Sequence, residues 1–179
     1  MYDTVLKLIL SADRRRPAST QPPALDPLFA RLADPDLRDA HETEDAIWAM
    51  WTGHSDAEAA QRMERAIAAI ARRQHDIAET HLSRLVEAHP DYAEAWNKCA
   101  TLLFVLKRDG ESVADIERVL RLEPRHFGAM CGFAQICLRA GDRAGALATF
   151  ETALAINPHM ASVRQAVEEL RRGFSRRVH

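Results

Sequence analysis

The sequence is poor in glycine and cysteine, and its charges nearly cancel. Only seven of the 179 residues are glycine, alanine is abundant and β-branched runs are few, which together favour helices. Three cysteines are an odd number and do not make a disulfide framework; they fit a reducing compartment, although buried thiols would also survive elsewhere. A net charge of −2 is not the basic footprint of a nucleic-acid-binding protein, so we expect no nucleic acid partner.

Long apolar runs are also absent. No segment approaches the ~20 consecutive apolar residues needed to cross a bilayer, so we expect no membrane span. The first ten residues contain a short apolar stretch, but the basic run from Arg14 to Arg16 follows it, whereas a secretory signal has the reverse order. We therefore expect a cytoplasmic protein, or a periplasmic one if the true start lies upstream.

Catalytic motifs are missing as well. The sequence has no phosphate-binding glycine loop, no Gly-x-Ser-x-Gly elbow and no His-Glu-x-x-His pair. Its eight histidines are scattered without a recurring ligand spacing, which predicts no metal site. Cys99 and Cys137 fall at core positions, whereas Cys131 projects towards the face where a partner would bind. We predict a chain that is not an enzyme and has no cofactor, with a reactive or partner-contacting Cys131 as the alternative.

A regular spacing of prolines is present. Pro90, Pro124 and Pro158 stand 34 residues apart. This interval is the length of one helix–turn–helix repeat, and apolar residues at helical spacing precede each proline as two helices. The prolines therefore divide the chain into predicted repeats over 57–90, 91–124 and 125–158.

Large and small residues recur at fixed places in these repeats. The middle repeat has Trp96, Cys99, Ala100, Leu103, Ser112, Ile116, Val119 and Pro124, and the last has Met130, Phe133, Ala134, Cys137, Ala146, Phe150, Ala153 and Pro158. This pattern resembles the tetratricopeptide repeat (TPR) family, including small bacterial TPR proteins. The resemblance implies an all-α fold, an α-solenoid of helix–turn–helix repeats wound as a right-handed superhelix.

The first repeat fits this pattern less well. Arg62 and Arg65 fall where apolar residues belong, and the helix is instead apolar one step around, at Met63 and Ile67. We predict that this helix packs in a rotated register, against the tryptophan-bearing helix that precedes it.

The segments outside the repeats differ in composition. Residues 1–24 are predicted to be a flexible N-terminal tail, because 11–24 are polar and proline-rich. Residues 25–54, which are rich in aromatic residues, are predicted to form a degenerate helical hairpin that caps the three repeats of 55–158. Residues 159–179 are predicted to be a C-terminal capping helix followed by a basic tail.

In the TPR family the first helices of the repeats line a concave face that binds partners, and the resemblance implies the same role for the matching positions here. The predicted groove comprises Met63, Ile67, Glu94, Asn97, Thr101, Phe104, Cys131, Gln135 and Leu138. Its low charge suits an apolar peptide or an amphipathic helix, and it lacks the basic clamp that grips acidic chaperone tails. Alternatively, these residues bury against the hairpin, or the first ten residues of the chain occupy the groove or pair two copies.

The function predicted from these features is a non-catalytic scaffold or adaptor that binds a peptide or helix of a protein partner. Two alternatives stay open: a regulatory subunit of a partner enzyme or assembly factor, and a protein attached peripherally through its basic ends. A homodimer is compatible with each of them.

Overall fold

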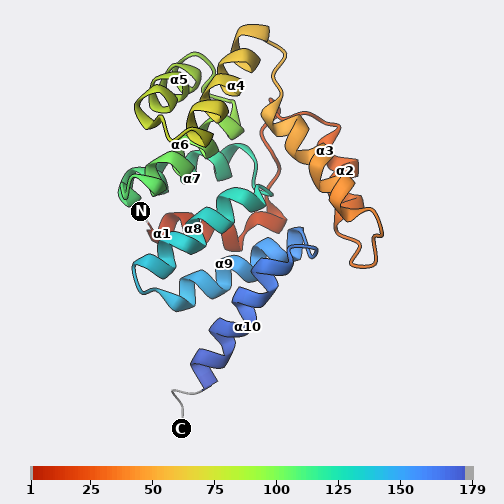
Figure 1. The fold of residues 1–179 in the computed structure, drawn as a ribbon. Helices are drawn as coiled ribbons and strands as arrows, with labels where there is room; N and C mark the ends of the chain where they lie inside the picture. The colour runs from red at the N-terminus through yellow and green to blue at the C-terminus, as the bar shows by residue number, and fades with distance from the viewer. Residues whose placement is uncertain (1, 176–179) are drawn as a thin grey trace.

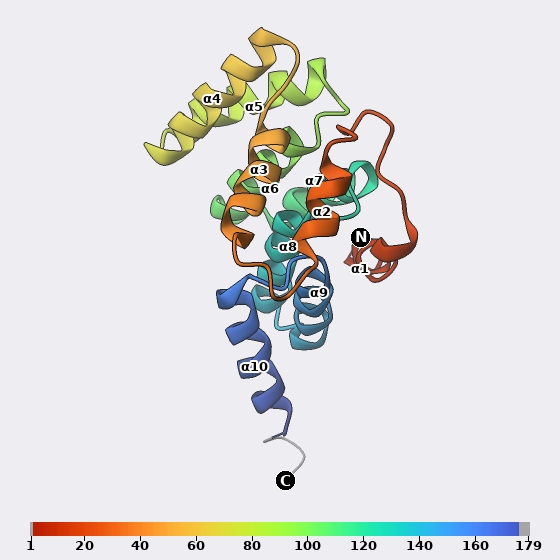
Figure 2. The same cartoon turned by 90° about the vertical axis from the view of Figure 1, so that its right-hand side faces the viewer.

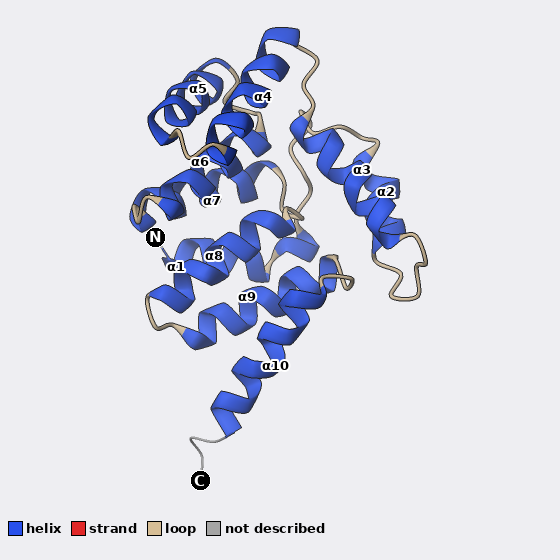
Figure 3. Ribbon diagram, viewed as in Figure 1, coloured by secondary structure: helices blue, strands red, loops and turns tan. Residues whose placement is uncertain are grey.

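The computed structural model describes residues 2–175, and over these residues the chain is helical without a strand (Figures 1 and 3). Three helix pairs stack along the molecule: α4 (Ala57–Ala71) with α5 (His75–Ala88), α6 (Ala93–Val105) with α7 (Asp109–Leu122), and α8 (Phe127–Arg139) with α9 (Arg143–Ile156). A last helix, α10 (Ala161–Ser175), packs on α9 through Val167 and Leu170. The predicted all-α solenoid is confirmed.

Small residues let the two helices of each pair approach closely. In the first and third repeats, the residues where the two helices meet are the fully buried pairs Ala66 with Ala78 and Ala134 with Ala146. In the second repeat the Ser112 hydroxyl donates a hydrogen bond of 2.8 Å to the carbonyl oxygen of Ala100. Any larger side chain there would push the helices apart, because such interiors are close-packed.

The turn inside each repeat contains one residue in the left-handed region. These residues are Arg73, Lys107 and Gly141, with φ of 57°, 61° and 82°. They stand 34 residues apart and follow the first helix of each repeat, where a left-handed residue lets the chain reverse. Only the third repeat has the glycine that takes this conformation without strain.

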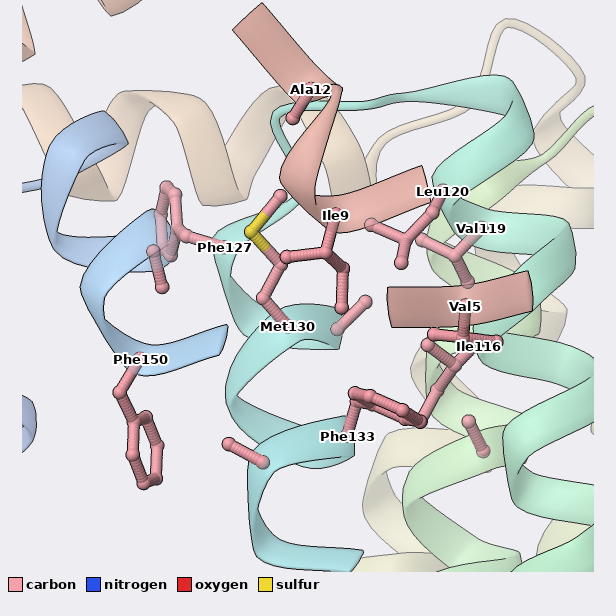
Figure 4. Close-up of a cluster of buried hydrophobic side chains, with 14 of the residues drawn as sticks. Val5, Ile9, Ala12, Ile116, Val119, Leu120, Phe127, Met130, Phe133 and Phe150 are labelled. Carbon is pink, nitrogen blue, oxygen red and sulfur yellow. The ribbon is translucent and has the colours of Figure 1, made fainter. Parts of the chain in front are cut away.

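The N-terminal segment differs from the flexible tail that the sequence predicts. Residues Tyr2–Leu10 form a helix, α1, that packs along α7 and α9, and a short 3₁₀ turn, η1 (Ala12–Arg14), follows it. Val5 and Ile9 lie one turn apart on the same side of α1, and both are fully buried (Figure 4). The physical reason is that apolar side chains line the gap between α7 and α9, and the apolar stripe of α1 is removed from water by packing against them.

The helices α2 (Leu25–Leu32) and α3 (Ala40–Thr52) form a hairpin, which packs on a different set of helices from those that hold α1. Helix α3 lies against α6, a first helix, whereas α1 lies against the second helices α7 and α9. In Figure 2, α1 lies to the right of α7 and α9, and α3 lies over α6. The first ten residues therefore do not enter the groove of first helices; the hairpin does.

The buried apolar residues form two clusters. The larger one joins α1, the hairpin, the second and third repeats and α10. The smaller one holds α4 and α5 together and reaches Tyr92, Ala95 and Leu102 at the start and middle of the next repeat. The first repeat is thus attached to the rest of the molecule by the smaller core.

The packing of helix α4 agrees only in part with the predicted rotated register. Met63 is buried inside the cluster shared with α5, while Arg62 lies at the surface side and pairs with Glu58 at 2.6 Å. Ile67 remains 38% exposed. The neighbours of α4 are α5 and α6, which differs from the predicted contact with the tryptophan helix. Part of the predicted basic tail, 176–179, lies outside the described residues.

Candidate functional site

The first helices α6 and α8 lie side by side, and α3 lies across their N-terminal ends. The Trp51 ring stacks on the His126 ring, with centroids 4.0 Å apart and planes 6° from parallel. Trp48 covers Gly128 so closely that an added Cβ would sit 2.6 Å from the indole. Glycine at position 128 is therefore what allows the tryptophan to reach the backbone of α8.

A buried polar network lies beneath these aromatic rings. Glu94, which is 1% exposed, accepts hydrogen bonds of 2.9 Å from Asn97 Nδ2 and from His126 Nε2, and Lys98 Nζ stands 2.7 Å from its other oxygen. The backbone N–H of Ala129 donates to His126 Nδ1 at 3.1 Å. Because Nδ1 accepts this bond, the ring carries its proton on Nε2 and donates it to Glu94.

The network keeps the Glu94 carboxylate charged. Burial alone would raise its pKa, but the hydrogen bond from His126, together with the charge of Lys98, holds the pKa of Glu94 below its ordinary value. A buried carboxylate is tolerated only when it is paired in this way. Glu94 and Asn97 therefore act inside the molecule, joining α6 to the start of α8 under the hairpin.

Polar contacts also fix the far end of the hairpin. Glu44 on α3 accepts a hydrogen bond of 3.0 Å from Asn157 Nδ2, and Trp48 Nε1 donates to the same carboxylate at 3.3 Å. His159 Nε2 lies 2.9 Å from the carbonyl oxygen of Asp34. The hairpin is thus bound both to the end of the third repeat, through Asn157, and to the segment that follows it, through His159.

The nine predicted groove residues fall into three classes of exposure. Met63, Glu94 and Asn97 are buried; Phe104, Cys131 and Leu138 are half-buried; Ile67, Thr101 and Gln135 are exposed. Burial, together with the nearby negative charge of Glu44, raises the pKa of the Cys131 thiol to about 12. Such a thiol stays protonated at neutral pH, which argues against a nucleophile there.

Four of the exposed and half-buried residues lie towards the C-terminal ends of α6 and α8. Thr101 and Phe104 occupy the same places in their repeat as Gln135 and Leu138 do in the next, so they form two matching rows on neighbouring helices. The Arg139 guanidinium lies 3.7 Å from the centroid of the Phe104 ring and donates a 2.7 Å bond to Asp109. This patch, which we call the open half of the groove, combines apolar surface and uncharged polar groups with the Arg139–Asp109 ion pair at its edge.

Sequence reasoning missed His126 as part of this face, and it did not predict that Lys98 pairs with Glu94 beneath α3. His126 belongs to no motif, and its contacts appear only once α3 is placed over it. The available signal was the pair Trp48 and Trp51, which stand one turn apart on a short helix and need a covered surface. Such a surface had to be found on the repeats.

Two kinds of site are not seen in the part of the chain that the structure describes. Residues 2–175 contain no group of three or more His, Cys, Asp and Glu side chains arranged to hold a metal ion. Across the same residues, no helix has both the length and the apolar character needed to traverse a bilayer.

Comparison with known proteins identifies the repeats. A family model described as tetratricopeptide repeat matches residues 63–115 and 110–161. The chain belongs to the tetratricopeptide repeat family. It is also 35% identical, over 161 residues, to a TPR repeat-containing protein of Rhizobium etli, an alignment that covers 88% of this chain and 78% of that protein. TPR repeats generally mediate protein–protein interaction.

Proposed function

We propose that this TPR protein is a non-catalytic scaffold that binds a segment of a partner protein on the open half of its groove. The observation that carries the proposal is α3 itself. An amphipathic helix of the chain already lies on the N-terminal half of the same face, with Trp51 on His126 and Trp48 on Gly128. The remaining half has the same helical scaffold and no covering segment among residues 2–175.

The chemistry of the open half favours an apolar peptide or an amphipathic helix. Phe104 and Leu138 offer apolar contact, while Thr101 and Gln135 offer hydrogen-bonding groups without charge. The acidic tails of chaperones need free lysine and arginine in the groove. Lys98 is paired with Glu94, so the absence of chaperone-tail binding stays our prediction.

The experiment is photo-crosslinking in the native cell, followed by binding measurements with the captured segment. We expect Phe104→Ala with Leu138→Ala to weaken that binding at least tenfold, because the two residues supply the apolar surface of the patch. Ile77→Ala is the matched control, since Ile77 is an exposed apolar residue on the second helix of the first repeat. Equal binding by the groove variant and the control would refute the proposal.

A further inference from the structure

The gap between the second helices α7 and α9 shows what kind of ligand these repeats accept on their other face. Helix α1 fills it, with Val5 and Ile9 fully buried (Figure 4). The side chains beneath α1 include Ile116 and Leu120 from α7 and Met130 and Phe133 from α8, and the Tyr2 and Phe133 rings stand 5.9 Å apart. The gap is thus a helix-binding groove, and in this repeat pair the chain supplies the helix.

The same gap exists one repeat earlier, between α5 and α7, and there no helix of the described chain fills it. It forms a cavity of about 350 Å³, and its lining comes from α5, α6, α7 and the turn before α7. The lining residues lie 34 positions before those that hold α1: Leu82, Val86, Trp96 and Cys99 stand where the next repeat has Ile116, Leu120, Met130 and Phe133. The cavity is therefore the repeat equivalent of the α1 groove.

Two substitutions give this cavity a character of its own. Cys99 is smaller than the Phe133 it replaces, which deepens the floor. Asp115 stands where the α1 groove has Thr149, and this carboxylate makes no side-chain hydrogen bond or ion pair with any residue from 2 to 175. The cavity therefore combines an apolar floor with an acidic wall.

The basic residue of the cavity is already engaged. Arg108 binds Glu79 of α5 at 2.6 Å and Glu111 of α7 at 2.6 Å, so its charge is shared between two carboxylates. With Asp115, the cavity has three acidic side chains against one guanidinium, and a cation bound beside Asp115 would favour the charged form of a side chain that burial keeps partly protonated near neutral pH. A ligand that supplies one positive charge would balance this wall, and an acidic ligand would be repelled.

We propose that the α5–α7 cavity is a docking site for an amphipathic helix of a partner protein, one that inserts apolar residues four apart and directs a lysine or arginine at Asp115. The apolar requirement follows from α1 in the equivalent groove, and the basic requirement follows from the unpaired carboxylate. This site is separate from the open half of the groove, so the proposal can be tested independently of the function proposed above.

The test places a photo-crosslinking amino acid at Ser83, an exposed residue of the cavity rim, in the full chain expressed in its native cell. Thr80 is the matched control position, because it is exposed on the same helix but does not line the cavity. We expect a crosslink from position 83, and not from position 80, that mass spectrometry maps to an amphipathic helix with a basic residue. A peptide of the mapped sequence then serves as the probe for affinity measurements.

We expect Asp115→Lys to weaken binding of that peptide at least tenfold, and Phe104→Ala with Leu138→Ala to leave it unchanged. Ser83→Arg is a second variant at an exposed position that folding tolerates, and it should weaken binding by placing a like charge at the rim. The proposal is overturned by no crosslink above the Thr80 control, by a crosslink to a second copy of this chain, or by a mapped segment without a basic residue. Unchanged affinity in both variants would overturn it as well.

Discussion

Replacing Ile9 by alanine measures directly whether the N-terminal segment is part of the folded protein. Ile9 is fully buried in the gap between α7 and α9, in the cluster that includes Leu120 and Met130 (Figure 4). Removing a buried isoleucine side chain to the Cβ costs about 2–5 kcal/mol, from the lost transfer free energy and the cavity left behind. We expect a loss within this range for Ile9→Ala.

The assay is urea denaturation followed by circular dichroism, at a fixed protein concentration. A destabilising substitution should lower the midpoint without changing the slope. In thermal unfolding, a chain of this size should lose roughly 2–4 °C of Tm for each kcal/mol. Leu10→Ala is the matched control, because Leu10 lies next to Ile9 on the same helix and is 51% exposed; its loss should stay within about 0.5 kcal/mol.

The refuting result is equally clear. If Ile9→Ala and Leu10→Ala both changed the free energy of unfolding by less than about 0.5 kcal/mol, Ile9 would be exposed in solution. The segment would then be the flexible tail that its composition suggests. The α5–α7 cavity would also lose its structural precedent, although the charge argument for Asp115 would remain.

Two further predictions concern the turns and the buried acid. Lys107→Gly should raise the free energy of unfolding by about 0.5–1 kcal/mol, because glycine takes the left-handed conformation without the strain that lysine bears. For the same reason, Gly141→Ala should lower it by about 1 kcal/mol. Equal and small effects of the two substitutions in urea denaturation would contradict this expectation. Burial, with Glu111 nearby, raises the pKa of Asp115 to about 7, so the folded chain holds a proton that the unfolded chain releases near pH 4. The stabilising effect of this proton is present below about pH 4 and is lost as the pH rises to 7. Between pH 4 and pH 8, the free energy of unfolding of Asp115→Asn should therefore rise by about 1–2 kcal/mol relative to that of the native chain, a range kept small because the side chain is partly exposed. A difference in unfolding free energy that does not change with pH would show that Asp115 titrates as an ordinary exposed acid.

The repeats could be predicted from sequence because their contacts are local. Each helix pair packs within 34 residues, so the size pattern and the prolines report directly on the packing. The docking of α1 could not be predicted in this way, because Val5 and Ile9 meet side chains more than 100 positions away. The short apolar stretch within the first ten residues is compatible with either a tail or a buried helix, and only the α7–α9 gap distinguishes the two.

The candidate site shows the same limit. Glu94 and Asn97 sit at groove positions by repeat numbering, and the structure places them at those positions but beneath α3. Whether a groove position is open depends on the hairpin, which belongs to no repeat pattern. The alternative that the hairpin fills the groove was visible in Trp48 and Trp51, but its extent depends on Gly128, where the absence of a side chain admits the indole.

The extensions of this chain therefore decide which surfaces of its repeats stay uncovered. TPR helices offer two kinds of surface, the face of the first helices and the gaps between the second helices, and here each kind carries one helix of the chain itself: α3 on the first and α1 in the second. Each occupied surface has an unoccupied counterpart, the open half of the groove and the α5–α7 cavity. Because the occupied and open surfaces belong to equivalent repeats, the proposed sites differ from the occupied ones in their side chains, such as Asp115 in place of Thr149, and a partner of the proposed sites would have to match these differences.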